Sequence, residues 1–164
     1  MAYFNNIKHR INFGKNAINK FLVTHELFHT SFYNENLLSC VISRLHQVNA
    51  TKLSFQNVDI PYNDFLFLTS HAESVSLSLS NVKNLTGLVV PLEKLIADLP
   101  KLKSIDLYDN HLQSISLVTV KELFKIPHFK NIENLEFIGL PDSFDIGIFF
   151  AFIKVCTACE FQVI

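Results

Sequence analysis

Residues 102–112 read Leu-Lys-Ser-Ile-Asp-Leu-Tyr-Asp-Asn-His-Leu, and they fill every fixed position of the pattern L-x-x-L-x-L-x-x-N-x-L. In an extended strand, Ile105 and Leu107 would point into one core, while the residues that alternate with them point the other way. Asn110 is expected to end the strand, where its amide can bond turn backbone groups that would otherwise be buried and unpaired. A single match of this kind predicts a fold only if the chain repeats it.

The apolar spacing recurs along the chain, although the turn asparagine is often replaced. Further copies keep apolar residues at Ala50, Leu53, Phe55, Val58 and Ile60, at Ala72, Val75, Leu77 and Val82, and at Ile132, Leu135 and Phe137. Their turns carry Gln56-Asn57, Ser80-Asn81 and Leu140, an earlier candidate copy holds Ile18, Phe21, Val23 and Phe28, and residues 160–164 predict a last strand. From Leu53 to Phe161 the strand centres follow at steps of 22, 30, 30 and 26 residues. Leucine-rich repeats have a similar period of about 20–29 residues.

The segments between the predicted strands have apolar residues at helical spacing. Helices are predicted over residues 36–48, 91–99, 117–126 and 143–155, with a shorter helix or turn over 61–68. Pro91 fits a helix N-terminus. Thr119 with Glu122 offers a capping box, and Ser143 or Asp145 can cap the last helix.

This alternation of strands and helices predicts an α/β fold, and specifically a leucine-rich-repeat-like solenoid. Such a solenoid would have a curved parallel sheet of about five or six short strands, with helices on its convex side. Residues 1–164 would form a single domain, with a divergent N-terminal cap or first repeat over 1–47 and about four irregular repeats over 48–164. A doubly wound α/β domain is the alternative, and the recurring turn residues favour the solenoid.

The composition indicates a chain that buries much of itself or meets a partner. Of its 164 residues, 49% are hydrophobic and 18% are charged, and the formal net charge is −1. No apolar run approaches the roughly 20 residues that span a bilayer, and the N-terminus lacks the apolar core of a signal peptide. No basic stripe suggests nucleic acid. We therefore expect a soluble protein of the cytoplasm or nucleus that binds neither nucleic acid nor membrane.

The three cysteines, Cys40, Cys156 and Cys159, are too few for a disulfide framework. Cys156 and Cys159 form a lone C-x-x-C, and no second pair of ligands completes a zinc site. This pair follows a predicted helix, whereas a thioredoxin-like redox pair begins one. We expect core or turn cysteines and no cofactor.

One catalytic motif is present, because residues 25–29 read His-Glu-Leu-Phe-His and match H-E-x-x-H. On a helix His25 and His29 could bind zinc while Glu26 acts as general base, which would make the protein a small zinc metallopeptidase. No third ligand follows at the expected spacing, and only 24 residues precede the motif. Residues 21–25 are also β-prone, and a strand there would put His25 and Glu26 on opposite faces. The metallopeptidase therefore stays an alternative, and we expect no enzyme.

Residues 48–150 resemble a large, divergent nematode family of F-box-associated, leucine-rich-repeat-like proteins. The resemblance lies in Asn-Ala-Thr-Lys-Leu-Ser-Phe at 49–55, Val-Pro-Leu-Glu-Lys at 90–94, Leu-Pro-Lys-Leu-Lys at 99–103, Thr-Val-Lys-Glu-Leu at 119–123, Ile-Pro-His-Phe at 126–129 and Ser-Phe-Asp at 143–145. It implies a substrate-recognition module, in some members joined to an F-box that binds an SCF-type ubiquitin ligase. Residues 1–47 show no F-box, so one lies outside this chain or is missing, and membership of a ligase stays open.

A solenoid presents the outward residues of its parallel strands to partners. The pattern nominates small, polar, acidic and aromatic side chains for this surface, namely Ser54, Gln56, Ser76, Ser78, Asp106, Tyr108, Glu136, Ile138, Glu160 and Gln162. Tyr108 is the best single anchor because tyrosine offers contact area at a low entropic cost. Asp106 and Glu136 would favour a basic partner. The expected function is therefore a non-catalytic protein-interaction module, whose partners would be ubiquitin-ligase subunits or a substrate.

Overall fold

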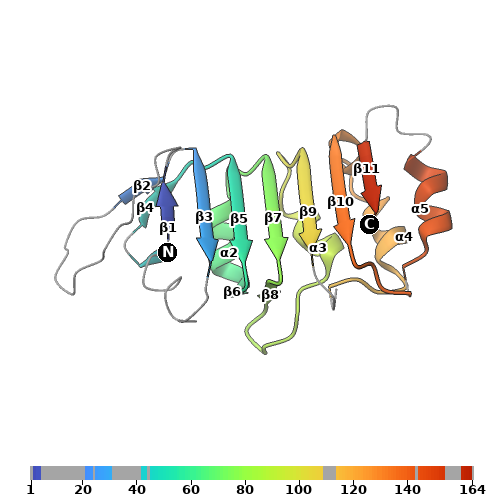
Figure 1. Cartoon of the computed structure of the whole chain (residues 1–164), viewed down its shortest axis with the longest axis horizontal. Coiled ribbons are helices and arrows are strands. Elements are labelled where there is room, and N and C mark those ends of the chain that lie inside the picture. Colours follow the sequence, from blue (N-terminus) through green and yellow to red (C-terminus); the bar gives the residue numbers. More distant parts are fainter. Residues whose placement is uncertain are drawn as a thin grey trace.

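The computed structural model describes residues 2–4, 21–23, 25–30, 42–43, 45–108, 114–142, 144–153 and 160–163. Together they form a mixed α/β fold in which one large sheet is backed by helices (Figure 1). The predictions for Asn110, Leu112, Ser143 and the three cysteines fall outside the described residues.

The main sheet follows the order of the chain from one edge to the other (Figure 1). Its described strands are β1 (Ala2–Phe4), β3 (Glu26–Thr30), β5 (Lys52–Gln56), β7 (Ser74–Ser78), β9 (Ser104–Tyr108), β10 (Asn134–Ile138) and β11 (Glu160–Val163). β1 is antiparallel to β3, and every other neighbouring pair is parallel. Two small parallel sheets pair β2 (Phe21–Val23) with β4 (Leu45–Val48), and β6 (Asp59–Pro61) with β8 (Asn81–Lys83).

Helices connect the strands, and in Figure 1 several of them lie behind the sheet. The described helices are α2 (Tyr62–Thr69), α3 (Leu92–Ala97), α4 (Thr119–Leu123), a 3-10 helix (Phe129–Asn131) and α5 (Ile146–Ile153). Pro61 and Pro91 stand immediately before α2 and α3, where the fixed φ of proline suits a helix start and its missing N–H costs no bond. Asp145 caps α5, because its Oδ1 accepts a bond from the Ile148 N–H. The predicted helices at 61–68, 91–99, 117–126 and 143–155 are thus confirmed in their cores.

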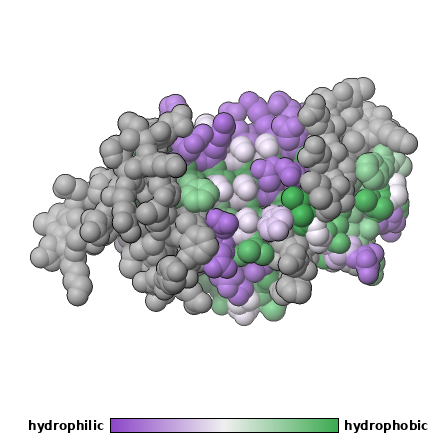
Figure 2. Space-filling view, viewed as in Figure 1, coloured by the Kyte–Doolittle hydropathy of each residue, from purple (hydrophilic) through white to green (hydrophobic). Residues whose placement is uncertain are grey.

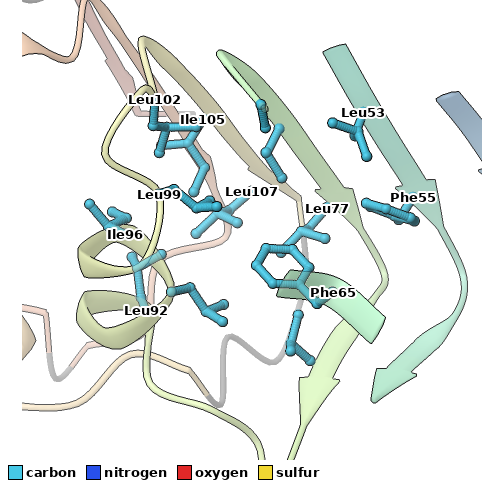
Figure 3. Packing of buried hydrophobic residues seen from close by; sticks show 14 of the residues in the cluster. Leu53, Phe55, Phe65, Leu77, Leu92, Ile96, Leu99, Leu102, Ile105 and Leu107 are labelled. Carbon is cyan, nitrogen blue, oxygen red and sulfur yellow. The ribbon is translucent and has the colours of Figure 1, made fainter. Parts of the chain in front are cut away.

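The core lies between the sheet and these helices (Figure 3). Alternate strand residues face it and are at most 7% exposed, namely Leu53, Phe55, Val75, Leu77, Ile105, Leu107, Leu135 and Phe137. They pack on apolar helix residues such as Phe65, Leu92 and Ile96. Each fully buried side chain of this size stabilises the fold by roughly 1.5–3 kcal/mol, so the period-two positions of the strands contribute substantially to stability.

A repeated pair of backbone hydrogen bonds links consecutive units where each strand begins. The backbone carbonyl of the residue that precedes one strand accepts two hydrogen bonds. One comes from the N–H of the residue that precedes the next strand, and the other comes from the N–H of the first residue of that next strand. This holds for His25 with Thr51 and Lys52, Thr51 with Glu73 and Ser74, Glu73 with Lys103 and Ser104, and Lys103 with Glu133 and Asn134. The same geometry therefore recurs four times along the sheet, although the loops between the strands differ in length.

Ser80 stands at the position of the turn asparagine in its copy of the pattern. Its side chain is 8% exposed, its Oγ donates to the Ser78 carbonyl at 2.9 Å, and it accepts a bond from the Val58 N–H at 3.1 Å. The serine hydroxyl thus bonds buried turn backbone, which is the role that the sequence pattern assigns to asparagine. In the next described copy the position holds Leu140, which instead packs against the core.

The first parallel strand of the main sheet, β3, is not where the apolar spacing predicted a strand. The copy built on Phe21 and Val23 is wrong in register, because Phe21–Val23 forms β2 and pairs with β4 in a separate sheet. Leu27 is instead aligned with Leu53 and is 2% exposed. Both segments are β-prone, and the pairing with β5, a tertiary contact, decides which of them joins the main sheet.

Two further local predictions fail. Residues 45–48, expected at the end of a helix, form strand β4. Thr119 does not form a capping box with Glu122, because Val118 occupies the N-cap and Thr119 lies inside α4. Its Oγ1 accepts a bond from the Ser116 N–H and donates one to Glu93. The hydroxyl therefore ties α4 to α3 instead of closing the first turn of its own helix.

Candidate functional site

The face of the main sheet that points away from the helices carries the predicted binding residues, and we call it the open face. Parallel pairing without offset puts Ser54, Ser76, Asp106 and Glu136 in one row across β5, β7, β9 and β10. A second row contains Gln56, Ser78, Tyr108 and Ile138. Gln162 is aligned with Glu136 and Glu160 with Asn134. Figure 2 looks onto the strands and shows mainly hydrophilic and near-neutral residues over their described central part.

Asp106 and Glu136 form an acidic pair on neighbouring strands, directly opposite each other in the register. Burial raises the pKa of the Asp106 carboxyl above its ordinary value, and the negative charge of Glu136 raises it further. A hydrogen bond from Ser104 offsets part of this effect. Of the ion pairs between described residues, none includes Asp106 or Glu136. The pair is therefore a half-buried concentration of negative charge that a cationic group from outside could relieve.

The opposite end of the open face is neutralised within the chain. Glu26 and Lys52 are aligned on β3 and β5, and Lys52 Nζ lies 3.8 Å from Glu26 Oε1. Between the two ends lie the small hydroxyl side chains of Ser54 and Ser76. The charge on the open face thus changes along the sheet, from the neutral pair Glu26 and Lys52 to the negatively charged pair Asp106 and Glu136.

The H-E-x-x-H motif does not lie on a helix. His25 occupies a bend, and residues 26–30 form strand β3, in which His29 is aligned with Phe55. Residues four apart in a helix have Cβ atoms about 5–6 Å apart, whereas four residues of strand span about 13 Å. The geometry that lets two histidines of this motif share one zinc ion is therefore not formed. In the described part of the chain, no group of three or more histidine, cysteine and acidic residues could hold a metal.

The carboxyl edge of the open face bears exposed apolar side chains. Tyr108 is 45% exposed and Leu79, which directly follows β7, is 44% exposed. The Leu79 N–H donates to the Tyr108 carbonyl at 2.7 Å, so the two residues are neighbours at this edge. The sequence pattern selected Tyr108 and missed Leu79. The available signal was that Asn57 and Gly139 occupy the corresponding position after β5 and β10.

A pocket of about 440 Å³ lies on a different part of the molecule, between the β6–β8 sheet, the start of α2 and the loop after β8. Its lining includes Asp59, Tyr62, Lys83 and Leu85. Lys83 Nζ lies 2.6 Å from Asp59 Oδ2. The Tyr62 hydroxyl donates to Asp98, and burial together with this bond raises the pKa of Tyr62. Asp59 and Lys83 bond each other and Tyr62 bonds Asp98, so the pocket offers mainly apolar surface. Sequence reasoning did not predict it.

Comparisons with protein-family models, with curated protein sequences and with solved structures gave no match for this chain. Among the described residues, no helix has both the length and the apolar character needed to cross a membrane.

Proposed function

We propose that this chain is a leucine-rich-repeat-like solenoid that binds another protein on the open face of its sheet. Three observations support the solenoid: the strands follow chain order, the same pair of backbone bonds recurs between units, and Ser80 takes the role of the turn asparagine. Repeat proteins of this type bury the side chains that build the core and present the alternating ones. The residues on the open face are then the ones that differ from unit to unit, and they can recognise a partner.

The single observation that carries the binding function is the acidic pair beside an exposed tyrosine. Asp106 and Glu136 lie opposite each other and Tyr108 follows two residues after Asp106 on the same face. Two like charges held side by side disfavour the isolated protein and favour the approach of a cation. Exposed aromatic side chains next to such charges are typical binding anchors. The partner we propose is a protein segment that carries lysine or arginine.

The resemblance to F-box-associated proteins supports a narrower role, in which the partner is a substrate delivered to an SCF-type ubiquitin ligase. In this role the open face would hold the substrate and other parts of the assembly would supply catalysis. No cofactor is needed for it. The narrower role depends on the resemblance alone, whereas binding on the open face depends on its geometry.

Affinity purification of the full chain from cells tests the proposed face. The variant Asp106→Arg with Tyr108→Ala should fold and lose the partners that the wild type retains. The matched control, Glu122→Arg with Leu117→Ala, makes the same kinds of change on α4 and in the exposed segment before it, and should retain them. Equal recovery of partners by both variants would contradict the proposed face. Cullin and adaptor subunits among the retained proteins would support the ligase role, and their absence would count against it.

A further inference from the structure

Leu79 has a backbone conformation that leucine rarely adopts. Its φ is +50°, in the left-handed region, where the β-carbon of an L residue crowds its own backbone. The turns after β5 and β10 need the same conformation at the same position and use Asn57, at φ +54°, and Gly139, at φ +82°. Asparagine and glycine tolerate this region best. The turn after β7 is therefore the one of the three that uses a poorly suited residue.

Packing explains the leucine only in part. Its side chain is 44% exposed, so a large share of the usual gain from burying an aliphatic chain is not realised. The hydrogen bond from the Leu79 N–H to the Tyr108 carbonyl uses backbone atoms, and asparagine or glycine could make it equally well. A strained residue that persists although much of its side chain stays exposed is a sign of a role at the surface.

We propose that Leu79 and Tyr108 together form the apolar anchor of the partner-binding surface, next to the acidic pair Asp106 and Glu136. The occupant is a segment of another protein that places an apolar side chain beside a lysine or arginine. This proposal rests on the proposed function and names the partner's chemistry. Residues two apart on one strand are about 7 Å apart, which sets the spacing between the cation at Asp106 and the apolar group at Tyr108.

A random peptide library displayed against the immobilised full chain supplies the probe. The expected result is a consensus in which a lysine or arginine accompanies a leucine or an aromatic residue. A consensus without a basic residue, or no enrichment, would overturn the proposal. One enriched peptide is then synthesised, and its affinity for the wild type and variants is measured by titration.

The decisive variant is Leu79→Asn, which installs the residue that the neighbouring turn uses. It should raise the melting temperature because the strain is relieved, and it should weaken the peptide at least about tenfold because the anchor is lost. Stability and binding therefore change in opposite directions, which a merely structural leucine would not produce. Leu85→Asn, at a side chain that is 97% exposed and lies on another loop, is the control and should leave the affinity unchanged.

The outcomes separate this inference from the proposed function. If Asp106→Arg weakens the peptide and Leu79→Asn does not, the open face binds but Leu79 is no anchor, and this inference is wrong. If neither variant changes the affinity, the proposal that the open face binds the partner is itself wrong. Loss of affinity in both variants, with Leu85→Asn unchanged, supports both proposals.

Discussion

The two faces of the main sheet share one backbone and differ in almost everything else. On the covered face, the row through β5, β7, β9 and β10 is aliphatic or aromatic in all four strands and at most 6% exposed, at Phe55, Leu77, Leu107 and Phe137. On the open face, the neighbouring row changes from serine in β5 and β7 to Asp106 and Glu136 in β9 and β10. The covered face thus carries buried apolar side chains in each of these strands, while the side chains of the open face differ from strand to strand. In the proposed function, the alternation of side chains along a strand separates the residues that stabilise the fold from those that recognise a partner.

The largest expected contrast lies between two adjacent residues of β5. Phe55→Ala removes a side chain that is fully buried and should lower the free energy of unfolding by about 3–5 kcal/mol. Ser54→Ala, one position earlier on the open face, should change it by less than about 0.5 kcal/mol. Urea denaturation of both variants measures the difference. Similar losses in the two variants would mean that both faces contribute to packing, against the separation described above.

A smaller loss is expected from a polar contact in the helix layer. Thr119 is fully buried, and its hydroxyl links Ser116 to Glu93. Thr119→Val keeps the shape but leaves these groups without the hydroxyl, and should destabilise the protein by about 1–2 kcal/mol. Thr51→Val, at an exposed threonine, is the matched control and should have almost no effect. A neutral result for Thr119→Val in thermal denaturation would show that the link between α3 and α4 contributes nothing.

The smallest effect is expected at Asp106, and it has the opposite sign. Because the pKa of Asp106 is raised in the folded protein, the folded state binds a proton more readily than the unfolded chain. Ionisation of Asp106 therefore costs stability, and this cost develops as the pH rises from the ordinary to the raised pKa. Asp106→Asn should raise the melting temperature at neutral pH, by less than Thr119→Val lowers it.

Acidic pH provides the check on this explanation. Below about pH 3 both states are protonated at Asp106, and the advantage of Asp106→Asn should disappear. Asp142→Asn, at an exposed aspartate after β10, makes the same substitution away from the acidic pair and serves as the control. An advantage that persists unchanged in acid would have a cause other than the charge of Asp106.

The sequence predicted those parts of the fold that depend on local periodicity. Strands around Leu53, Val75, Ile105 and Leu135 were found because alternation and the turn pattern point to the same register, and the open-face residues follow from that register. The first strand was misplaced because residues 21–23 and 26–30 are both β-prone, and only their tertiary partners distinguish them. The strained turn at Leu79 was missed, because a leucine itself carries no sign of a left-handed backbone and only the corresponding residues Asn57 and Gly139 indicate it.

We propose that the open face, and not the helix layer, recognises a basic partner. The most direct test of this proposal is the affinity of the selected peptide for Glu136→Arg, on β10, and for Glu122→Arg, on α4. Both variants change the net charge equally, so general electrostatic attraction is matched and only the position differs. Binding should be at least about tenfold weaker for Glu136→Arg and unchanged for Glu122→Arg. Equal affinities in the two variants, or a loss confined to Glu122→Arg, would contradict the proposal.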